Sequence, residues 1–320
     1  MRKPVLMFAC VSLLTVSAWA GAAEPCRYSA PRNAEIDAAG LKSLLVQIGP
    51  DNLVIRGQPG LTKVTVKGTA CASNENWLKD IKIETSRHGD SASVIARDDT
   101  HSVVFSLFGN SYAYLKLDVS VPQALVVKLG VGSGDAHVSN LAALHASVGS
   151  GDLKVNDVAG EFGLSVGSGD AVAGNVGSLD LSSVGSGDAT VDGVHGDAHA
   201  GSVGSGDLHL RNVKRDVSLG SVGSGDARLA GVGGSIKVDS VGSGDVRISD
   251  VTGNASVGTI SSGGVGIKHA GGSVHAGSVG SGDFDADGVG GDFSVDSLGS
   301  GDASHHGVKG KVNVPRSDDD

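Results

Sequence analysis

The most regular array of functional groups in this 320-residue sequence is a series of aspartates, each closing a Val-Gly-Ser-Gly-Asp string. Successive strings begin 17, 18 and 18 residues apart, and then 19 residues apart. Two copies depart from the pattern, because Gly264 replaces the aspartate in one and Leu298 replaces the valine in another. The aspartates are Asp135, Asp152, Asp170, Asp188, Asp207, Asp226, Asp245, Asp283 and Asp302.

Two kinds of chemistry could use such a series. Carboxylates stacked at the strand spacing of about 4.8 Å repel one another by roughly 1 kcal/mol even in water, so something must compensate. Each carboxylate could accept hydrogen bonds from amides of the Gly-Ser-Gly turns, or calcium could lie between successive coils. Calcium takes six to eight oxygens, and one aspartate per coil supplies few of them. We therefore predict a structural aspartate ladder, with no metal or cofactor site.

Histidines are the second group that could do chemistry. A metal site needs several of them at one position on neighbouring coils. The residues that share a position are four coils apart, so scattered surface histidines are the better interpretation. These histidines are His137, His145, His195, His199, His209, His269, His275, His305 and His306.

A polysaccharide-acting β-helix enzyme is the leading catalytic alternative. Such an enzyme needs clustered carboxylates in an aromatic-lined cleft. The only aromatic residues after residue 130 are Phe162, Phe284 and Phe293, and the coil length hardly varies, which leaves no long loops to build a cleft. We assign no catalytic residue.

The elements that position these residues follow from the repeat. With the valine of each string as position 1, positions 6 and 8 are apolar and position 7 is usually polar, which is the alternation of a β-strand. Position 10 is usually Asn, Asp or Gly, as a turn with positive φ requires, and position 11 is almost always Val. Identical inward positions at fixed spacing predict equivalent strands that stack in parallel. The fold class is therefore an all-β parallel β-solenoid (β-helix) of about ten 17–19-residue coils.

The region before the repeat is also β-rich, and six of its segments have the composition of strands. It contains bulkier residues, such as Trp77, Tyr112 and Tyr114. We expect it to form an N-terminal cap that covers the open end of the first coil. The strand segments are residues 44–48, 53–55, 64–66, 81–84, 103–105 and 115–119.

The first residues resemble a secretory signal. Arg2 and Lys3 precede a short apolar stretch, and small residues follow near residue 20. Removing this segment changes the net charge from −10 to −12, by loss of Arg2 and Lys3, and an acidic chain is a poor candidate for binding nucleic acid. No integral membrane segment is expected in the mature chain. Cys26 and Cys71 then form an even pair in an oxidising compartment, which predicts a disulfide.

A family resemblance rests on three features: the β-rich lead, the Val-Pro-x-x-Leu-x-Val segment at 121–127, and the tandem Gly-Ser-Gly-Asp coils. Together they resemble the bacterial putative-adhesin family, which is related to the GIN-type head domain of putative auto-transporter adhesins. The resemblance covers roughly residues 36–314. It implies a β-solenoid at the cell envelope and a role in adhesion, and the family has no catalytic motif to carry over.

The sequence thus predicts a signal peptide at 1–22, an N-terminal β-rich cap region at 23–129, a β-solenoid at 130–314 and an acidic tail at 315–320. The predicted function is a non-enzymatic exported structural or adhesive protein of the cell envelope. A polysaccharide-acting enzyme and a calcium-stabilised surface solenoid are the alternatives. The partner is an unidentified surface, glycan or protein, and the location is the periplasm, the cell surface or the extracellular space.

Overall fold

The computed structural model describes residues 26–98 and 112–315. The expected signal peptide, the strand segment at 103–105 and residues 316–320 of the expected tail lie outside these ranges. The N-terminal elements are β1 (Tyr28–Pro31), β2 (Ala34–Asp37), β3 (Ser43–Ile48), β4 (Asn52–Gln58), β5 (Lys63–Ala72), the 3-10 helix η1 (Glu75–Lys79), β6 (Ile81–His88), β7 (Ser91–Asp98) and β8 (Ala113–Pro122).

The remaining strands form the repeat. They are β9 (Val126–Val131), β10 (Asp135–Leu141), β11 (Ala143–Val148), β12 (Asp152–Val166), β13 (Asp170–Val184), β14 (Ala189–Val194), β15 (Ala198–Val203), β16 (Leu208–Val213), β17 (Val217–Val222), β18 (Ala227–Val232), β19 (Ile236–Val241), β20 (Val246–Val251), β21 (Ala255–Ile260), β22 (Gly264–Ala270), β23 (Val274–Val279), β24 (Asp283–Val289), β25 (Phe293–Leu298), β26 (Asp302–His306) and β27 (Val312–Asn313).

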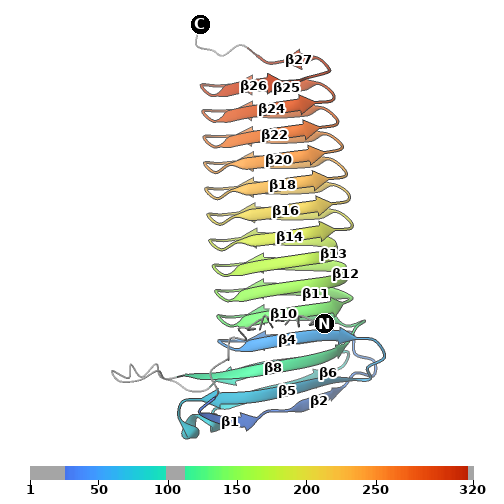
Figure 1. Ribbon diagram of the computed structural model, residues 1–320, viewed down its shortest axis with the longest axis vertical. Coiled ribbons are helices and arrows are strands. Elements are labelled where there is room, and N and C mark those ends of the chain that lie inside the picture. The colour runs from blue at the N-terminus through green and yellow to red at the C-terminus, as the bar shows by residue number, and fades with distance from the viewer. Residues whose placement is uncertain (1–25, 99–111, 316–320) are drawn as a thin grey trace, which may run out of the picture.

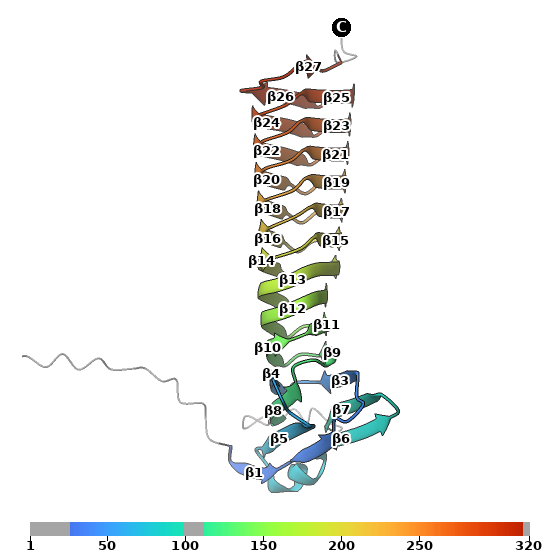
Figure 2. The same cartoon turned by 90° about the vertical axis from the view of Figure 1, so that its right-hand side faces the viewer.

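These strands form a rod with two faces (Figures 1 and 2). From β14 onward each coil has one strand on each face. The even-numbered strands pair in parallel with the even-numbered strands of the adjacent coils, and the odd-numbered strands do the same on the other face. β12 and β13 are long enough to contribute to both faces. The prediction of a parallel β-solenoid of about ten coils is confirmed.

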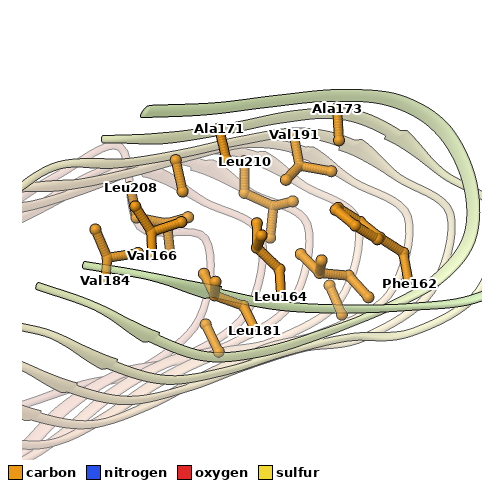
Figure 3. Packing of buried hydrophobic residues seen from close by; sticks show 14 of the residues in the cluster. Phe162, Leu164, Val166, Ala171, Ala173, Leu181, Val184, Val191, Leu208 and Leu210 are labelled. Atoms are coloured by element: carbon orange, nitrogen blue, oxygen red, sulfur yellow. The ribbon is translucent and has the colours of Figure 1, made fainter. Parts of the chain in front are cut away.

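The core lies between the two faces and consists of columns of like side chains. Leu208 and Leu210, at positions 6 and 8, are fully buried, whereas His209 between them points outward. Val213 at position 11 is buried as well, and Figure 3 shows how side chains from both faces meet in the interior. Burying each such side chain contributes about 1.5–3 kcal/mol. The predicted alternation of the repeat is therefore confirmed.

Glycine at position 4 is required by the close stacking of the coils. Gly225 is buried, and a Cβ added to it would lie 1.9 Å from the carbonyl oxygen of Gly206 in the preceding coil. The same approach recurs at position 4 along the rod, for example between Gly244 and Gly225 at 1.8 Å. No side chain fits at that distance, so this column sets the coil spacing at one edge of the rod.

Position 10 adopts the left-handed conformation, in agreement with its Asn, Asp and Gly content. The φ angles are 57° at Asn212, 69° at Gly231 and 57° at Asp250. Asn and Asp tolerate this region better than other residues with a side chain, which accounts for their use where glycine is absent.

The parallel stack extends below residue 130 into the N-terminal region. β3 pairs in parallel with β9, with Ile48 opposite Val131, and β4 pairs in parallel with β10, with Asn52 opposite Asp135. On the opposite edge of each strand, β3 pairs in parallel with β7, and β4 pairs in parallel with β8. The coil formed by β3 and β4 therefore lies between two coils that follow it in the sequence.

An antiparallel layer closes the lower end of the rod (Figure 1). β5 pairs with β8, β1 and β2 pair with β5, and β6 pairs with β7, all antiparallel. A disulfide joins Cys26 to Cys71, with their Cα atoms 5.3 Å apart, and so attaches the chain ahead of β1 to β5. Arg32 adds hydrogen bonds from its guanidinium to the carbonyl oxygens of Ile81 and Leu78.

Candidate functional site

The aspartates of the repeat lie in one column, each at or directly before the first residue of a strand: β10, β12, β13 and the even-numbered strands from β14 onward. Their carboxylates accept hydrogen bonds from the backbone amide one coil further along the rod. The amide of Asp207 donates to Oδ1 of Asp188 at 3.1 Å, and the amide of Asp226 donates to Oδ1 of Asp207 at 3.2 Å. The series continues to Gly264, whose amide donates to Asp245 at 3.1 Å. Each of these hydrogen bonds places the partial positive charge of an amide beside a carboxylate, which offsets the repulsion between neighbouring carboxylates.

The hydrogen bonds to carboxylates occupy the middle of this column. They involve Asp170, Asp188, Asp207, Asp226 and Asp245 as acceptors. Asp135, Asp152, Asp283 and Asp302 lie in the same column by strand register.

Two arginines reinforce the middle of the column. The guanidinium of Arg228 lies 3.1 Å from Asp226 and 3.5 Å from Asp207, and that of Arg247 lies 2.9 Å from Asp245 and 3.4 Å from Asp226. These groups are partly exposed, so each pair contributes little to stability by itself. Their main effect is to reduce the negative charge of the ladder over three coils.

A second ladder, not found by the sequence analysis, lies at position 14, in the turn before each odd-numbered strand. The carboxylate of Asp216 accepts from the amide of Ser235, the hydroxyl of Ser235 accepts from the amide of Asn254, and the side-chain oxygen of Asn254 accepts from the amide of Ser273. Because Asp, Ser and Asn alternate here, no single residue type marks the column. The signal that could have found it is a short side chain with an acceptor oxygen directly before each strand.

Histidines of the repeat have local partners on the surface. His199 is 2.8 Å from the hydroxyl of Ser218, and His275 is 3.0 Å from that of Ser294. His269 lies 3.1 Å from Asp250 across one coil. Within residues 26–98 and 112–315, no group of three or more His, Cys, Asp or Glu side chains could hold a metal ion.

The odd-numbered face carries a groove of about 730 Å³ that crosses successive coils from β13 to β23. One side is the position-14 ladder, and the outward residues of position 16 provide His199, Ser218, Lys237 and Ser256. The floor consists of the buried apolar residues of position 15, such as Val217. The groove therefore offers a row of hydroxyl, imidazole and carboxylate groups along the rod.

The three phenylalanines of the repeat do not line a surface site. Phe162, Phe284 and Phe293 are fully buried. The rings of Phe284 and Phe293 stack with centroids 5.4 Å apart, and His305 packs on Phe293 at 5.2 Å. Phe284 and Phe293 therefore fill the core of the last coils, whereas Phe162 lies in β12, in one of the first coils.

At the other end of the rod, Asp51 is a buried carboxylate at 3% exposure. It accepts hydrogen bonds from the amide of Leu115 at 2.7 Å and from that of Gly49 at 3.2 Å. Burial raises the pKa of Asp51 above its ordinary value of 3.8, and the two hydrogen bonds oppose that shift. Its backbone lies directly below Gly134, so Asp51 begins the column that glycines continue.

The architecture and its surface ladders define a parallel β-solenoid. Among the described residues, no helix is long and apolar enough to cross a membrane. The family described as "Putative auto-transporter adhesin, head GIN domain" matches residues 72–255, which is more than half of the chain. The chain belongs to this family, and the predicted resemblance is confirmed.

Solved structures with low sequence identity also match. A putative adhesin from Bacteroides fragilis is 14% identical, with 91% of this chain and 99% of that chain covered and a TM-score of 0.33. A putative adhesin from Parabacteroides merdae is 13% identical over 89% of this chain and 96% of that chain, with a TM-score of 0.34. A putative lipid binding protein from Parabacteroides distasonis is 15% identical over 89% and 97%, with a TM-score of 0.28. No curated protein matches the chain.

Proposed function

We propose that this protein is exported and acts as a non-enzymatic structural and adhesive module of the bacterial cell envelope. The groove of the odd-numbered face is the surface that binds, and its ligand is an extended polar polymer that lies along the rod. Family membership supports the adhesive role. The secretory character of residues 1–22 and the disulfide between Cys26 and Cys71 support export.

The observation that carries the proposal is the repetition of hydrogen-bonding groups along the groove. Ser218, Lys237 and Ser256 follow one another in strand register on three consecutive coils. Hydrogen-bonding side chains at equivalent positions therefore recur at the strand spacing of about 4.8 Å, so a polymer with regularly spaced polar groups could contact several coils at once. Many weak contacts of this kind add up when they belong to one chain.

The test is a binding panel of bacterial and host glycans and matrix proteins, run beside a polysaccharide turnover assay. Ser218→Trp places a bulky side chain in the groove, and Val172→Trp is the matched control, because Val172 is 49% exposed on the even-numbered face. We expect Ser218→Trp to weaken binding at least about tenfold and the control to bind normally. Binding unchanged by Ser218→Trp would reject the groove, and turnover abolished by a single Asp substitution would establish an enzyme instead.

Export and calcium dependence are tested separately. Cell fractionation should recover the protein outside the cytoplasm with its first residues removed. Melting in calcium and in chelator should give the same midpoint, since an ion that binds only the folded state must raise it. A midpoint that rises with calcium would support the calcium-stabilised solenoid.

A further inference from the structure

The two faces of the rod end at different levels. The even-numbered face ends at β26, which pairs with β24, whereas the odd-numbered face ends at β27, which pairs with β25. Figure 2 shows β25 and β26 at the same level and β27 beyond them both. Among the described residues, no strand lies opposite β27 on the even-numbered face or pairs with the outer edge of β26. The rod therefore ends in half a layer.

Apolar side chains are exposed at this half layer. Val312 of β27 is 45% exposed, and the only other large hydrophobic residue exposed in the described chain is Val172 of β13. Val308 and Val314 are only partly buried, although the residues at the same positions of the preceding coil are fully buried. The end of the core is thus in contact with solvent.

The backbone at this end also has hydrogen-bonding groups at its outer edge. The amide of Phe293, at position 15, donates to the carbonyl oxygen of Lys311 in the next coil at 2.9 Å, and the amide of Ala227, at position 6, donates toward the next coil in the same way. Residues two apart in a strand direct these groups to the same edge. His305 of β26 and Val314 of β27 therefore direct theirs to the outer edge, where no described strand pairs with them.

We propose that a second copy of the chain completes this layer, around a two-fold axis that runs parallel to the strands, through the core, at the level of β27. The rotation exchanges the two faces, so β27 of the second copy lies on β26, and β26 of the second copy lies on β27. It reverses the direction of the rod but keeps the direction of each strand. The preceding coils of the two copies therefore lie on opposite sides of the axis and do not overlap.

The strands that meet are correctly oriented for pairing. The chain crosses one face and returns along the other, so β26 and β27 run in opposite directions and the new pair is antiparallel. The middle inward positions of each coil, 8 and 17, lie across the core from each other, as Figure 3 shows for earlier coils. The rotation therefore sets Val314 of one copy beside His305 of the other, with their amide and carbonyl groups facing. Val312 and Val314 of both copies fill the core of the shared layer.

A second copy fits this end better than residues 316–320 do. Those residues are an arginine, a serine and three aspartates, and none of them suits an inward position of the repeat. A second copy supplies valines instead, and it covers the outer edges of β26 and β27 in one operation, as a self-complementary two-fold interface must. Burial of the end of the core favours association. Only the cross-section of the rod is covered, so the dimer is weaker than one with an interface of standard size.

One contact opposes association. Lys309 lies in the middle of the turn between β26 and β27, and the rotation stacks this turn on the same turn of the second copy, with the two lysines adjacent. The side chain of Lys309 forms no hydrogen bond or ion pair with a described residue. Salt screens the repulsion between like charges. Added salt should therefore strengthen this dimer, in contrast to a dimer that ion pairs hold together.

The first test is sedimentation of the purified chain at concentrations up to about 1 mM, with and without added salt. We expect a monomer–dimer equilibrium that shifts toward the dimer as salt is added. Val312→Asp should raise the dissociation constant at least about tenfold, because it buries a charge in the shared layer. Val172→Asp is the matched control, since Val172 is exposed to a similar extent on β13, far from this end. A chain that stays monomeric, a dimer weakened by salt, or Val312→Asp with an unchanged dissociation constant would overturn the proposal.

The second test looks for a gain of association, which loss of fold cannot produce. Lys309→Ser should lower the dissociation constant roughly threefold at low salt and leave it unchanged at high salt. Spin labels attached through Ser300→Cys, near this end, should give a short distance between copies, whereas labels attached through Ser133→Cys, in the first coil, should give none. A weaker dimer with Lys309→Ser, or a short distance at residue 133, would show that the copies meet elsewhere. Neither outcome depends on the groove of the odd-numbered face.

Discussion

The repeat and the N-terminal region solve the same packing problem in different ways. The repeat consists of small side chains, and its order comes from backbone contacts that recur in every coil, such as the approach of Gly225 to Gly206. The N-terminal region uses larger side chains, antiparallel pairing and one disulfide. The difference teaches that the repeat should be intolerant of a methyl group added at position 4, whereas the N-terminal region should depend on its disulfide.

The largest expected effect tests the backbone contacts of the repeat. Gly225→Ala would place a Cβ 1.9 Å from the carbonyl oxygen of Gly206, so the coils must separate. We expect the free energy of unfolding to fall by at least about 3 kcal/mol. Gly266→Ala is the matched control and should change it by no more than about 0.5 kcal/mol, since the space is open. Chemical denaturation measures both, and equal effects would refute the close-stacking argument.

The next effect tests the N-terminal region. Replacing Cys26 and Cys71 by serine should lower the free energy of unfolding by about 2–4 kcal/mol. The reason is that the disulfide joins two residues 45 apart in the sequence and so restricts the conformations of the unfolded chain. Fluorescence of Trp77, which lies in η1, reports on this region, whereas circular dichroism reports mainly on the repeat. We expect the Trp77 transition to move more than the circular dichroism transition. Equal shifts would mean that the two regions unfold as one unit.

A smaller effect tests the aspartate ladder. Asp226→Ala removes the acceptor for the amide of Asp245, at 3.2 Å, and should cost about 1–2 kcal/mol. Asp226→Asn keeps a side-chain oxygen in place and loses only the exposed pairs with Arg228 and Arg247, so its cost should be smaller. Thermal melting distinguishes them. If Asn were as harmful as Ala, charge would be the important property of the ladder.

The smallest effect concerns the pH dependence due to Asp51. Burial raises its pKa above 3.8, so the folded chain binds this proton more tightly than the unfolded chain. The contribution of Asp51 to stability is then greatest below pH 3.8 and decreases as pH rises from 3.8 through the raised pKa. Relative to Asp51→Asn, the natural chain should lose stability over that interval. Denaturation at several pH values measures it, and a relative gain with rising pH would contradict the raised pKa.

The fold of the repeat could be predicted because the same residue types recur at the same positions. Leu208 and Leu210 alternate with His209, and Val213 marks the next inward position. Such identity indicates which residues stack, even though the contacts are a full coil apart. Five of the strand segments expected before the repeat were also confirmed, as β3, β4, β5, β6 and β8.

The place of β3 and β4 could not be predicted in this way. Residues 48–52 share with the repeat only an apolar residue and Gly49, and proline and Asp51 occupy the next two positions. Their position within the stack depends on parallel pairs with β7, β8, β9 and β10, which lie far from them in the sequence. The position-14 ladder was missed for another reason, since Asp216, Ser235 and Asn254 share an acceptor oxygen but not an identity.

The position-4 glycines also determine how such a rod can change in length. Coils of 17, 18 and 19 residues all keep the contact between the glycine and the carbonyl below it, so a coil can gain or lose a residue without lengthening the rod, whereas duplication of one entire unit adds a coil and preserves each contact. Reach can therefore vary only in whole increments, each of about 4.8 Å. Tandem duplication and deletion would alter the distance that the molecule spans, while both of its ends stay the same.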